Sequence, residues 1–161
     1  MLKNYLYKYY SDCSNIDKIF VNDCRENNCR VVDVPNDNII LDGDEIENCL
    51  SKHLDNSTDR IILCLSVDGV DIHICELSKG KRHPEVIKRK MEHTSNHIVN
   101  VINESKFGIN SLKCSYIGQY EDLYKGLMKK KSPVIKIPHL NKYNIIIKRF
   151  NCGISFDKLI N

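Results

Sequence analysis

The sequence contains neither alanine nor tryptophan, and it has no apolar run long enough to cross a bilayer. Polar residues interrupt its first segment, MLKNYLYKYYSDCSN, every few positions, so that segment lacks the apolar stretch of a signal peptide. Glycine-rich phosphate loops and the serine-hydrolase elbow are absent as well. We therefore expect a cytoplasmic protein with no membrane partner, and the sequence gives no sign of a P-loop enzyme or a serine hydrolase.

The length and composition are those of one folded domain. A chain of 161 residues can bury a substantial core but is short for two domains. Its hydrophobic fraction of 42% and charged fraction of 28% are ordinary for a globular protein. We predict a single α/β domain over residues 1–161, with a central mixed β-sheet flanked by helices.

Charge is distributed unevenly along the chain. Residues 1–60 carry a net charge of −5 and residues 61–161 a net charge of +8, which together give the overall +3. A basic half is typical of proteins that bind an anionic partner such as nucleic acid, although a solvated lysine-rich surface has the same composition. The oligomeric state cannot be read from the sequence, which leaves a homodimer open.

Cysteine is frequent for a chain of this length, beside abundant isoleucine, asparagine and lysine. Eight cysteines would suggest a disulfide framework in a small secreted protein, but this chain is longer and shows no export signal. We therefore expect most of them to be thiols, with a bond or two left open. Cys24 and Cys29 form a single C-x₄-C pair, which is weak evidence for zinc without a second pair.

A β-hairpin is predicted over residues 59–79, DRIILCLSVDGVDIHICELSK. Asp68 and Gly69 stand between two hydrophobic runs, and that dipeptide is typical of a two-residue turn because a type I′ turn needs positive φ at both central positions. With Asp68 and Gly69 as the loop, Leu63 faces Ile74 across the hairpin. The register of every other pair follows from this turn.

Two acidic residues then end the apolar face of the hairpin. In this register Ile61 faces Glu76 and Asp59 faces Ser78, and opposite side chains share a face. Charged groups there need a partner, a metal ion or solvent. They therefore either form a functional site or mark the point where the sheet meets solvent.

The hairpin is followed by a long helix and a third strand. Proline suits the first turn of a helix over residues 84–105, and Ile87, Met91 and Thr94 begin its apolar stripe, with Lys90 assigned to the polar faces. The segment SLKCSYIG, residues 111–118, reads as a strand parallel to a hairpin strand, because a helical crossover leads to it.

The remaining segments give shorter elements. Asp42 or Asp44 can cap a helix that runs to about Leu54. The extended segments CRVVDV and NIILDG are expected to form a hairpin or an extended pair, and residues 120–131 a further helix. PVIKIPHL and NKYNIIIKRF read as strands, the first at a sheet edge because of its prolines.

This order of elements, with an Asp on one strand and Glu-x-Lys ending the next, resembles the core of the PD-(D/E)XK (restriction-endonuclease-like) nuclease superfamily. The resemblance covers about residues 42–118. It implies that Asp59, Glu76 and the backbone carbonyl of Leu77 hold Mg²⁺ or Mn²⁺. It also implies a Glu on the preceding helix, for which Glu45 and Glu47 are the candidates.

The motif departs from the family pattern at one position. It reads Glu76-Leu77-Ser78-Lys79, with serine where lysine is expected. Lys79 would point to the opposite face of a regular strand unless a β-bulge near Ser78 turned it back. Otherwise Lys88 or Lys90 of the following helix would supply the ammonium, and Lys90 is our choice.

The resemblance and the charges together imply DNA, rather than RNA, as the partner. A basic connection and the start of the next helix converge on the acidic end of the sheet, where a phosphate backbone would be drawn electrostatically. The basic residues concerned are Lys79, Lys81, Arg82, His83, Lys88 and Arg89.

Two other groupings could in principle hold a metal. Cys64 is expected opposite His73, with Cys75 on the same face, but a fourth zinc ligand is missing, so a core cluster is the better interpretation. His93 and His97 lie one helical turn apart without the Glu of a metalloprotease motif, and we expect them to be solvated.

The expected function is a metal-dependent hydrolase that cleaves DNA phosphodiester bonds, as an endonuclease or an exonuclease, with Asp59, Glu76, Ser78, Lys79 and Lys90 in its catalytic site. The alternative is a catalytically inactive relative that uses the same fold to bind nucleic acid or a protein, which the serine at position 78 favours. A structural or interaction protein whose basic half is incidental is the third reading.

Overall fold

The computed structural model describes residues 1–50, 57–78, 84–118, 134–136 and 144–161. Its helices are α1 (Leu2–Tyr9), α2 (Ile16–Ile19), α3 (Gly43–Leu50), α4 (Pro84–Glu104) and α5 (Phe156–Ile160). Its strands are β1 (Phe20–Val21), β2 (Cys24–Glu26), β3 (Cys29–Val31), β4 (Ile39–Asp42), β5 (Arg60–Ser66), β6 (Gly69–Ser78), β7 (Ile109–Gly118), β8 (Val134–Lys136) and β9 (Asn144–Phe150).

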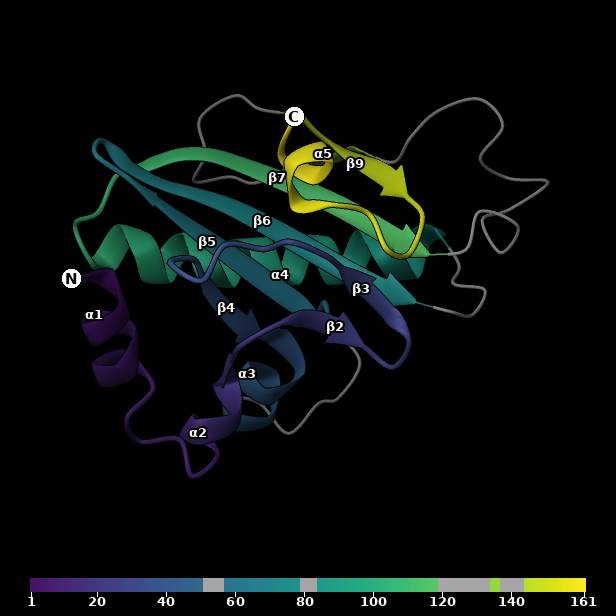
Figure 1. Cartoon of the computed structure of the whole chain (residues 1–161). Coiled ribbons are helices and arrows are strands. Elements are labelled where there is room, and N and C mark those ends of the chain that lie inside the picture. The colour runs from purple at the N-terminus through teal and green to yellow at the C-terminus, as the bar shows by residue number, and fades with distance from the viewer. Residues whose placement is uncertain (51–56, 79–83, 119–133, 137–143) are drawn as a thin grey trace.

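A mixed β-sheet forms the centre of the fold, in the order β1-β4-β5-β6-β7-β9-β8 (Figure 1). The pairs β1–β4, β4–β5, β5–β6 and β8–β9 are antiparallel, whereas β7 lies parallel to β6 and β9 parallel to β7. Helix α4 makes the crossover from β6 to β7, as a parallel connection requires. The predicted α/β class, the long helix and the parallel strand are confirmed.

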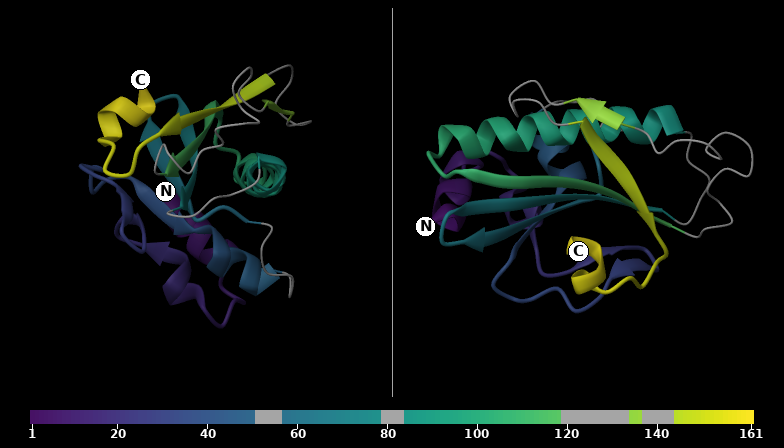
Figure 2. Two further views of the ribbon diagram at one scale, coloured as in Figure 1. Left: turned by 90° about the vertical axis from the view of Figure 1, so that its right-hand side faces the viewer. Right: turned by 90° about the horizontal axis from the view of Figure 1, so that it is seen from above.

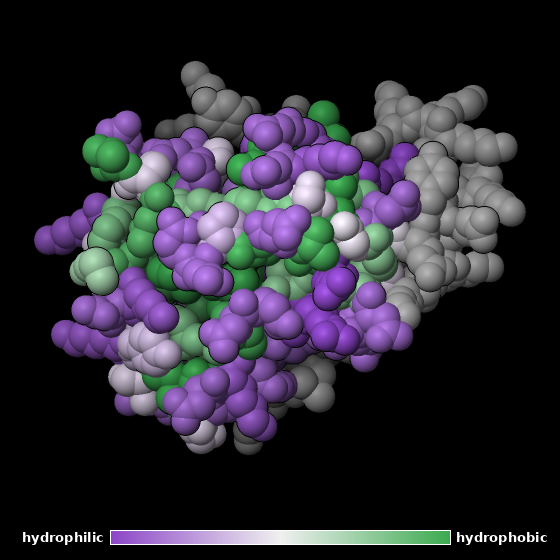
Figure 3. All heavy atoms as spheres, viewed as in Figure 1, coloured by the Kyte–Doolittle hydropathy of each residue, from purple (hydrophilic) through white to green (hydrophobic). Residues whose placement is uncertain are grey.

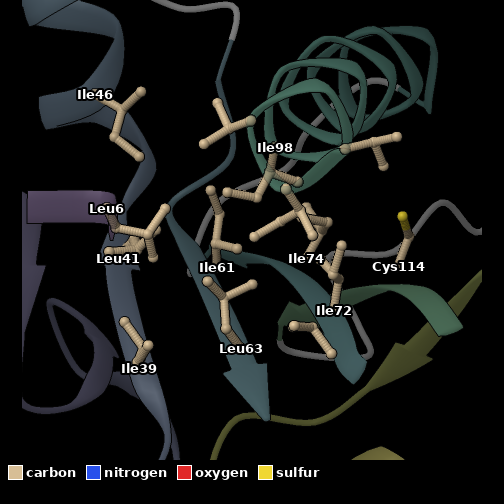
Figure 4. Packing of buried hydrophobic residues seen from close by; sticks show 14 of the residues in the cluster. Leu6, Ile39, Leu41, Ile46, Ile61, Leu63, Ile72, Ile74, Ile98 and Cys114 are labelled. Carbon is tan, nitrogen blue, oxygen red and sulfur yellow. The ribbon is translucent and has the colours of Figure 1, made fainter. Parts of the chain in front are cut away.

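Helices cover one face of this sheet, and a small β-hairpin with α5 covers the other. Figure 2 shows α4 on one side and the β2–β3 hairpin with α5 on the opposite side. The helical face holds the larger hydrophobic core, in which Ile61, Ile72 and Ile74 of the sheet pack with Ile98 of α4 (Figure 4). Cys24, Cys29 and Val31 of the small hairpin belong to the second core, with Ile62, Cys75, Leu77, Ile117, Phe156 and Leu159.

The central hairpin forms, but with a different turn from the predicted one. Ser66 pairs with Gly69, so Val67 and Asp68 make the loop, and the predicted Asp68-Gly69 loop is wrong. Gly69 is the first residue of β6. A side chain does not fit there, because an added Cβ would lie 2.5 Å from the carbonyl oxygen of Gly108. Val67 is fully exposed at the tip.

With this turn, β6 is shifted by two residues along β5 relative to the predicted register. Leu63 pairs with Ile72 rather than Ile74, and Ile61 pairs with Ile74 rather than Glu76. Because side chains alternate with a period of two, a shift of two leaves every side chain on its predicted face. The last pair, Arg60 with Cys75, brings Asp59 toward Glu76 instead of Ser78.

Other predicted elements hold in part. Asp42 caps α3, since its Oδ1 accepts the Glu45 N–H at 3.0 Å, and the helix is described as far as Leu50. The segments CRVVDV and NIILDG do not pair, because β3 pairs with β2 while β4 lies between β1 and β5. Strand β8 lies at the sheet edge as predicted. The helix predicted over 120–131 falls outside the described residues.

None of the helices within the described ranges combines the length and hydropathy that a bilayer crossing requires. The face shown in Figure 3 is covered mostly by hydrophilic side chains, with smaller hydrophobic areas between them.

Candidate active site at the end of the central strands

Asp59 lies directly before β5, at the end of the sheet where β6 and β7 terminate. Its side chain is buried, and Oδ2 accepts the backbone N–H of Leu77 at 2.6 Å. Its carbonyl oxygen accepts the N–H of Gly43, the first residue of α3, at 3.1 Å. Asp59 is thus fixed between the start of α3 and the end of β6.

Glu76 and Lys90 form a buried ion pair beside Asp59. Lys90 Nζ lies 2.9 Å from Glu76 Oε1, and the two side chains are only 6% and 1% exposed. Lys90 is therefore not on a polar face of the long helix, as the sequence suggested, but on its buried side with Ile87 and Met91. It is the lysine chosen from the sequence as the substitute for the missing motif lysine.

The pKa of Asp59 is raised to about 8. Burial is the main cause, because water can no longer solvate the charged carboxylate, and repulsion from Glu76 is the second. The Leu77 N–H bond and the Lys90 charge oppose the rise without cancelling it. A carboxyl group with so high a pKa beside a second carboxylate is typical of functional sites, although structural networks also produce it.

Of the acidic side chains of α3, Asp44 interacts electrostatically with Asp59, whereas Glu47 and Glu45 have other contacts. Glu47 is buried, with Oε1 4.0 Å from Nε2 of His93 on α4. Asp44 accepts a hydrogen bond from the Ser57 hydroxyl at 3.0 Å, and burial raises its pKa. Glu45 bonds instead to the Asn15 side chain at 2.7 Å, so Glu47 is the better candidate of the two.

The other residues of the motif lie as follows. Ser78 is buried at the end of β6. The pairing of β6 with β7 is regular from Asp71 to Ser78, with its one register shift at Val70/Asp71, so no bulge near Ser78 is found. Lys79 itself lies outside the described residues, together with Lys81, Arg82 and His83. On α4, Lys88 is half-buried and Arg89 exposed.

A cavity of about 170 Å³ separates α3 from α4 next to Glu47. Histidines 93 and 97 line it, along with Ile46 and Thr94. His97 is not solvated as expected. Its Nε2 lies 2.9 Å from the Tyr10 hydroxyl, and burial lowers its pKa to about 4.

The alternative zinc cluster is not formed. Cys64 pairs with Asp71 rather than with His73, which packs edge-on against the Phe156 ring instead. Burial lowers the pKa of His73 to about 4, as in a core histidine. Within the described ranges, no group of three or more His, Cys, Asp or Glu side chains is arranged to hold a metal ion.

Arg60 is a residue of the site that the sequence interpretation missed. Its Nη1 contacts the Asp59 carbonyl at 2.7 Å and the Asp42 carboxylate at 2.9 Å. Its Nη2 donates to the Arg25 carbonyl at 2.5 Å and to Glu26 at 3.2 Å. Arg60 thus links the strand start that carries Asp59 to the β2–β3 hairpin. An arginine directly after the key aspartate, at the head of an apolar strand, was the available signal.

Disulfides anchor both elements that flank the site. Cys13–Cys49 ties the last turn of α3 to the segment after α1, and Cys29–Cys152 ties the β2–β3 hairpin to the chain after β9. The remaining four cysteines are thiols, so thiols are half of the eight rather than most of them, and the two bonds are the one or two that the sequence left open. Long-range pairs of this kind cannot be deduced from spacing alone.

Comparison of the chain with family models, curated proteins and solved structures found no match in any of the three.

Proposed function

We propose that this chain is a divalent-metal-dependent nuclease-like protein that hydrolyses DNA phosphodiester bonds, with Asp59, Glu76 and Lys90 at its centre. The observation that carries the proposal is the buried Glu76–Lys90 pair beside Asp59. Burying three ionisable groups together costs free energy because the groups lose their hydration, whereas an apolar cluster at the same place would carry no such cost. A functional role accounts for that cost better than a structural one.

The order of the elements supports the resemblance to the PD-(D/E)XK superfamily. Helix α3 precedes β5 and β6, and α4 leads to β7, with Asp59 directly before β5 and Glu76 near the end of β6. Lys90 Nζ reaches Glu76 from α4, so an ammonium is present even though Ser78 occupies the motif position. The restriction-endonuclease-like fold is part of this proposal.

The donor atoms fit a hard cation such as Mg²⁺ or Mn²⁺, which prefers oxygen ligands. Asp59, Glu76 and the Leu77 carbonyl would hold it, with Glu47 as the α3 carboxylate that the resemblance adds. A divalent charge would offset the repulsion from Glu76 that helps to raise the pKa of Asp59. When bound, such an ion would lower the pKa of a water molecule and neutralise charge on the phosphate.

The protein's own groups would then orient the reactants. Lys90, already hydrogen-bonded to Glu76, can donate a second hydrogen bond to the attacking water or to a phosphate oxygen. Without a cation, Asp59 with its pKa of about 8 is mostly protonated at neutral pH. Lys88 and Arg89 at the start of α4, with the basic segment 79–83, would attract the DNA backbone.

The proposal is tested by incubating single- and double-stranded DNA with the protein and Mg²⁺ or Mn²⁺. We expect cleavage that EDTA abolishes and that Asp59→Asn and Glu76→Gln each reduce by about 100-fold or more. Glu104→Gln, an exposed change at the far end of α4, is the matched control and should cleave like the wild type. Cleavage that survives in both site variants would refute the assignment.

A catalytically inactive nuclease-fold protein that binds nucleic acid or a protein partner is the alternative. The serine at position 78 favours it, as does the pairing of Lys90 with an oxygen of Glu76 that a cation would use. DNA binding without cleavage, unchanged by the Asp59 and Glu76 substitutions, would support this alternative. Absence of any binding would leave a structural or interaction protein.

A further inference from the structure

We propose that Arg25 and Arg30, an exposed arginine pair on the β2–β3 hairpin, bind the phosphate backbone of the nucleic acid. This inference rests on the proposed function, because it names a second contact surface for the same substrate. Arg25 and Arg30 face each other directly across the two strands, and both are exposed. Neither position was singled out from the sequence.

The pair is unusual because like charges directly opposite on adjacent strands destabilise a hairpin. No acidic side chain in the described ranges forms an ion pair with either guanidinium. Arg25 Nε donates only to the Asn27 carbonyl of the same hairpin. Of the acidic residues around them, Glu26 is bound to Arg60 instead. Asp23 and Asp33 line the same hollow as the two arginines but form no ion pair with either. The hairpin therefore presents two guanidinium groups whose repulsion an anion would relieve.

The hairpin is held firmly enough to position these groups. Cys29 is joined to Cys152, and the Arg30 carbonyl accepts the Gly153 N–H at 2.8 Å. Cys24, Cys29 and Val31 are buried against the sheet, which leaves Arg25 and Arg30 on the outward side. A two-stranded hairpin alone is only marginally stable, so these anchors determine its place.

The β2–β3 hairpin also lies at the end of the sheet where Asp59 is found. One guanidinium, that of Arg60, contacts both the Asp59 carbonyl and the Arg25 carbonyl, so the hairpin begins next to the acidic pair. Figure 1 shows the hairpin turn at the end of the sheet where β6 and β7 terminate and α4 begins. In Figure 3 strongly hydrophilic side chains gather over this hairpin.

This placement gives the acidic site basic groups on both sides. Lys88 and Arg89 lie on the helical face of the sheet, and Arg25 and Arg30 lie on the opposite face. A nucleic acid that reaches Asp59 and Glu76 would meet both surfaces. Arginine suits this contact because its planar fork matches two phosphate oxygens.

The test is the affinity for a fluorescein-labelled DNA duplex, measured by anisotropy in Ca²⁺ buffer over a range of salt concentrations. We expect Arg25→Ala/Arg30→Ala to weaken binding about tenfold and to reduce the slope of log Kd against log salt by up to about 1.8. Lys3→Ala/Lys8→Ala removes the same charge from exposed positions on α1, at the other end of the molecule, and should leave both values unchanged.

A folding control separates recognition from structure. Arg30→Glu places opposite charges across the strands, so its thermal midpoint should be equal to or above that of the wild type while its DNA binding falls. If the wild type binds and cleaves DNA but the double alanine variant binds equally well, this inference fails and the proposed function stands. If the wild type neither binds nor cleaves DNA, both fail.

Discussion

Replacing Lys90 by methionine is expected to lower the free energy of unfolding by about 3–5 kcal/mol. The substitution keeps the length and packing of the side chain but removes the ammonium that pairs with Glu76 Oε1 at 2.9 Å. Glu76 is 1% exposed, so its carboxylate cannot recover that interaction from water. Urea unfolding of the purified variant measures the loss directly.

A double-mutant cycle shows whether this loss belongs to the pair. Glu76→Gln should also destabilise the protein, whereas Lys90→Met combined with Glu76→Gln should recover most of the stability, because neither charge is then buried alone. Lys88→Met is the matched control, since Lys88 is half-buried on the same helix with no ion pair among the described residues. Equal losses from both lysine substitutions would contradict the buried pair.

Replacing Arg60 by methionine should cost a similar amount, about 3–5 kcal/mol, and should also disturb the site. Arg60 is 8% exposed, and its guanidinium contacts Asp42, Glu26 and two backbone carbonyls. Its loss leaves the half-buried Asp42 carboxylate without its cation and releases the β2–β3 hairpin from the start of β5, next to Asp59. Denaturant unfolding measures the first effect.

The pH dependence of this variant identifies the cause. Burial already raises the pKa of Asp42 while the Arg60 charge opposes the rise, so removing Arg60 raises the pKa further. A protonated Asp42 needs no cation, so the stability difference should be full at neutral pH and shrink as Asp42 takes up its proton in acid. Arg89→Met, on an exposed part of α4, should have no such effect. A difference that is constant with pH would show that packing, not charge, is lost.

The alternation of apolar residues along β5 and β6 was sufficient to predict which side chains share a face of the central hairpin. The turn was misplaced, yet Asp59 and Glu76 kept a common face because the error was an even number of residues. An error of one residue would have separated them. The alternation of side chains is therefore a more robust guide to a shared site than the register.

Helical periodicity predicted the apolar stripe of α4 but not the burial of Lys90 on that stripe. Lys90 follows Ile87 by three positions and precedes Thr94 by four, so it lies on the stripe by spacing. Its charge suggested a polar face instead. Burial became possible because Glu76, on a different element, supplies the opposite charge, and a contact of that kind is visible only in the folded structure.

The β2–β3 hairpin and its anchors could not be predicted for a related reason. Its place depends on Arg60 and on Cys29–Cys152, which joins residues 123 positions apart. Neither contact leaves a periodic signal in the sequence. The surface inferred for the DNA backbone is accordingly a product of the tertiary structure.

The measurement that tests the central claim most directly is a calorimetric titration of Mg²⁺ into the protein at pH 8.5 and at pH 6.5. We predict one Mg²⁺ per chain at pH 8.5, with weaker binding at pH 6.5, because a ligand with a pKa of about 8 must lose its proton first. Asp59→Asn and Glu76→Gln should abolish the binding, and Glu104→Gln should preserve it. No binding by the wild type, or equal binding by Asp59→Asn, would contradict a metal site at the acidic end of these strands.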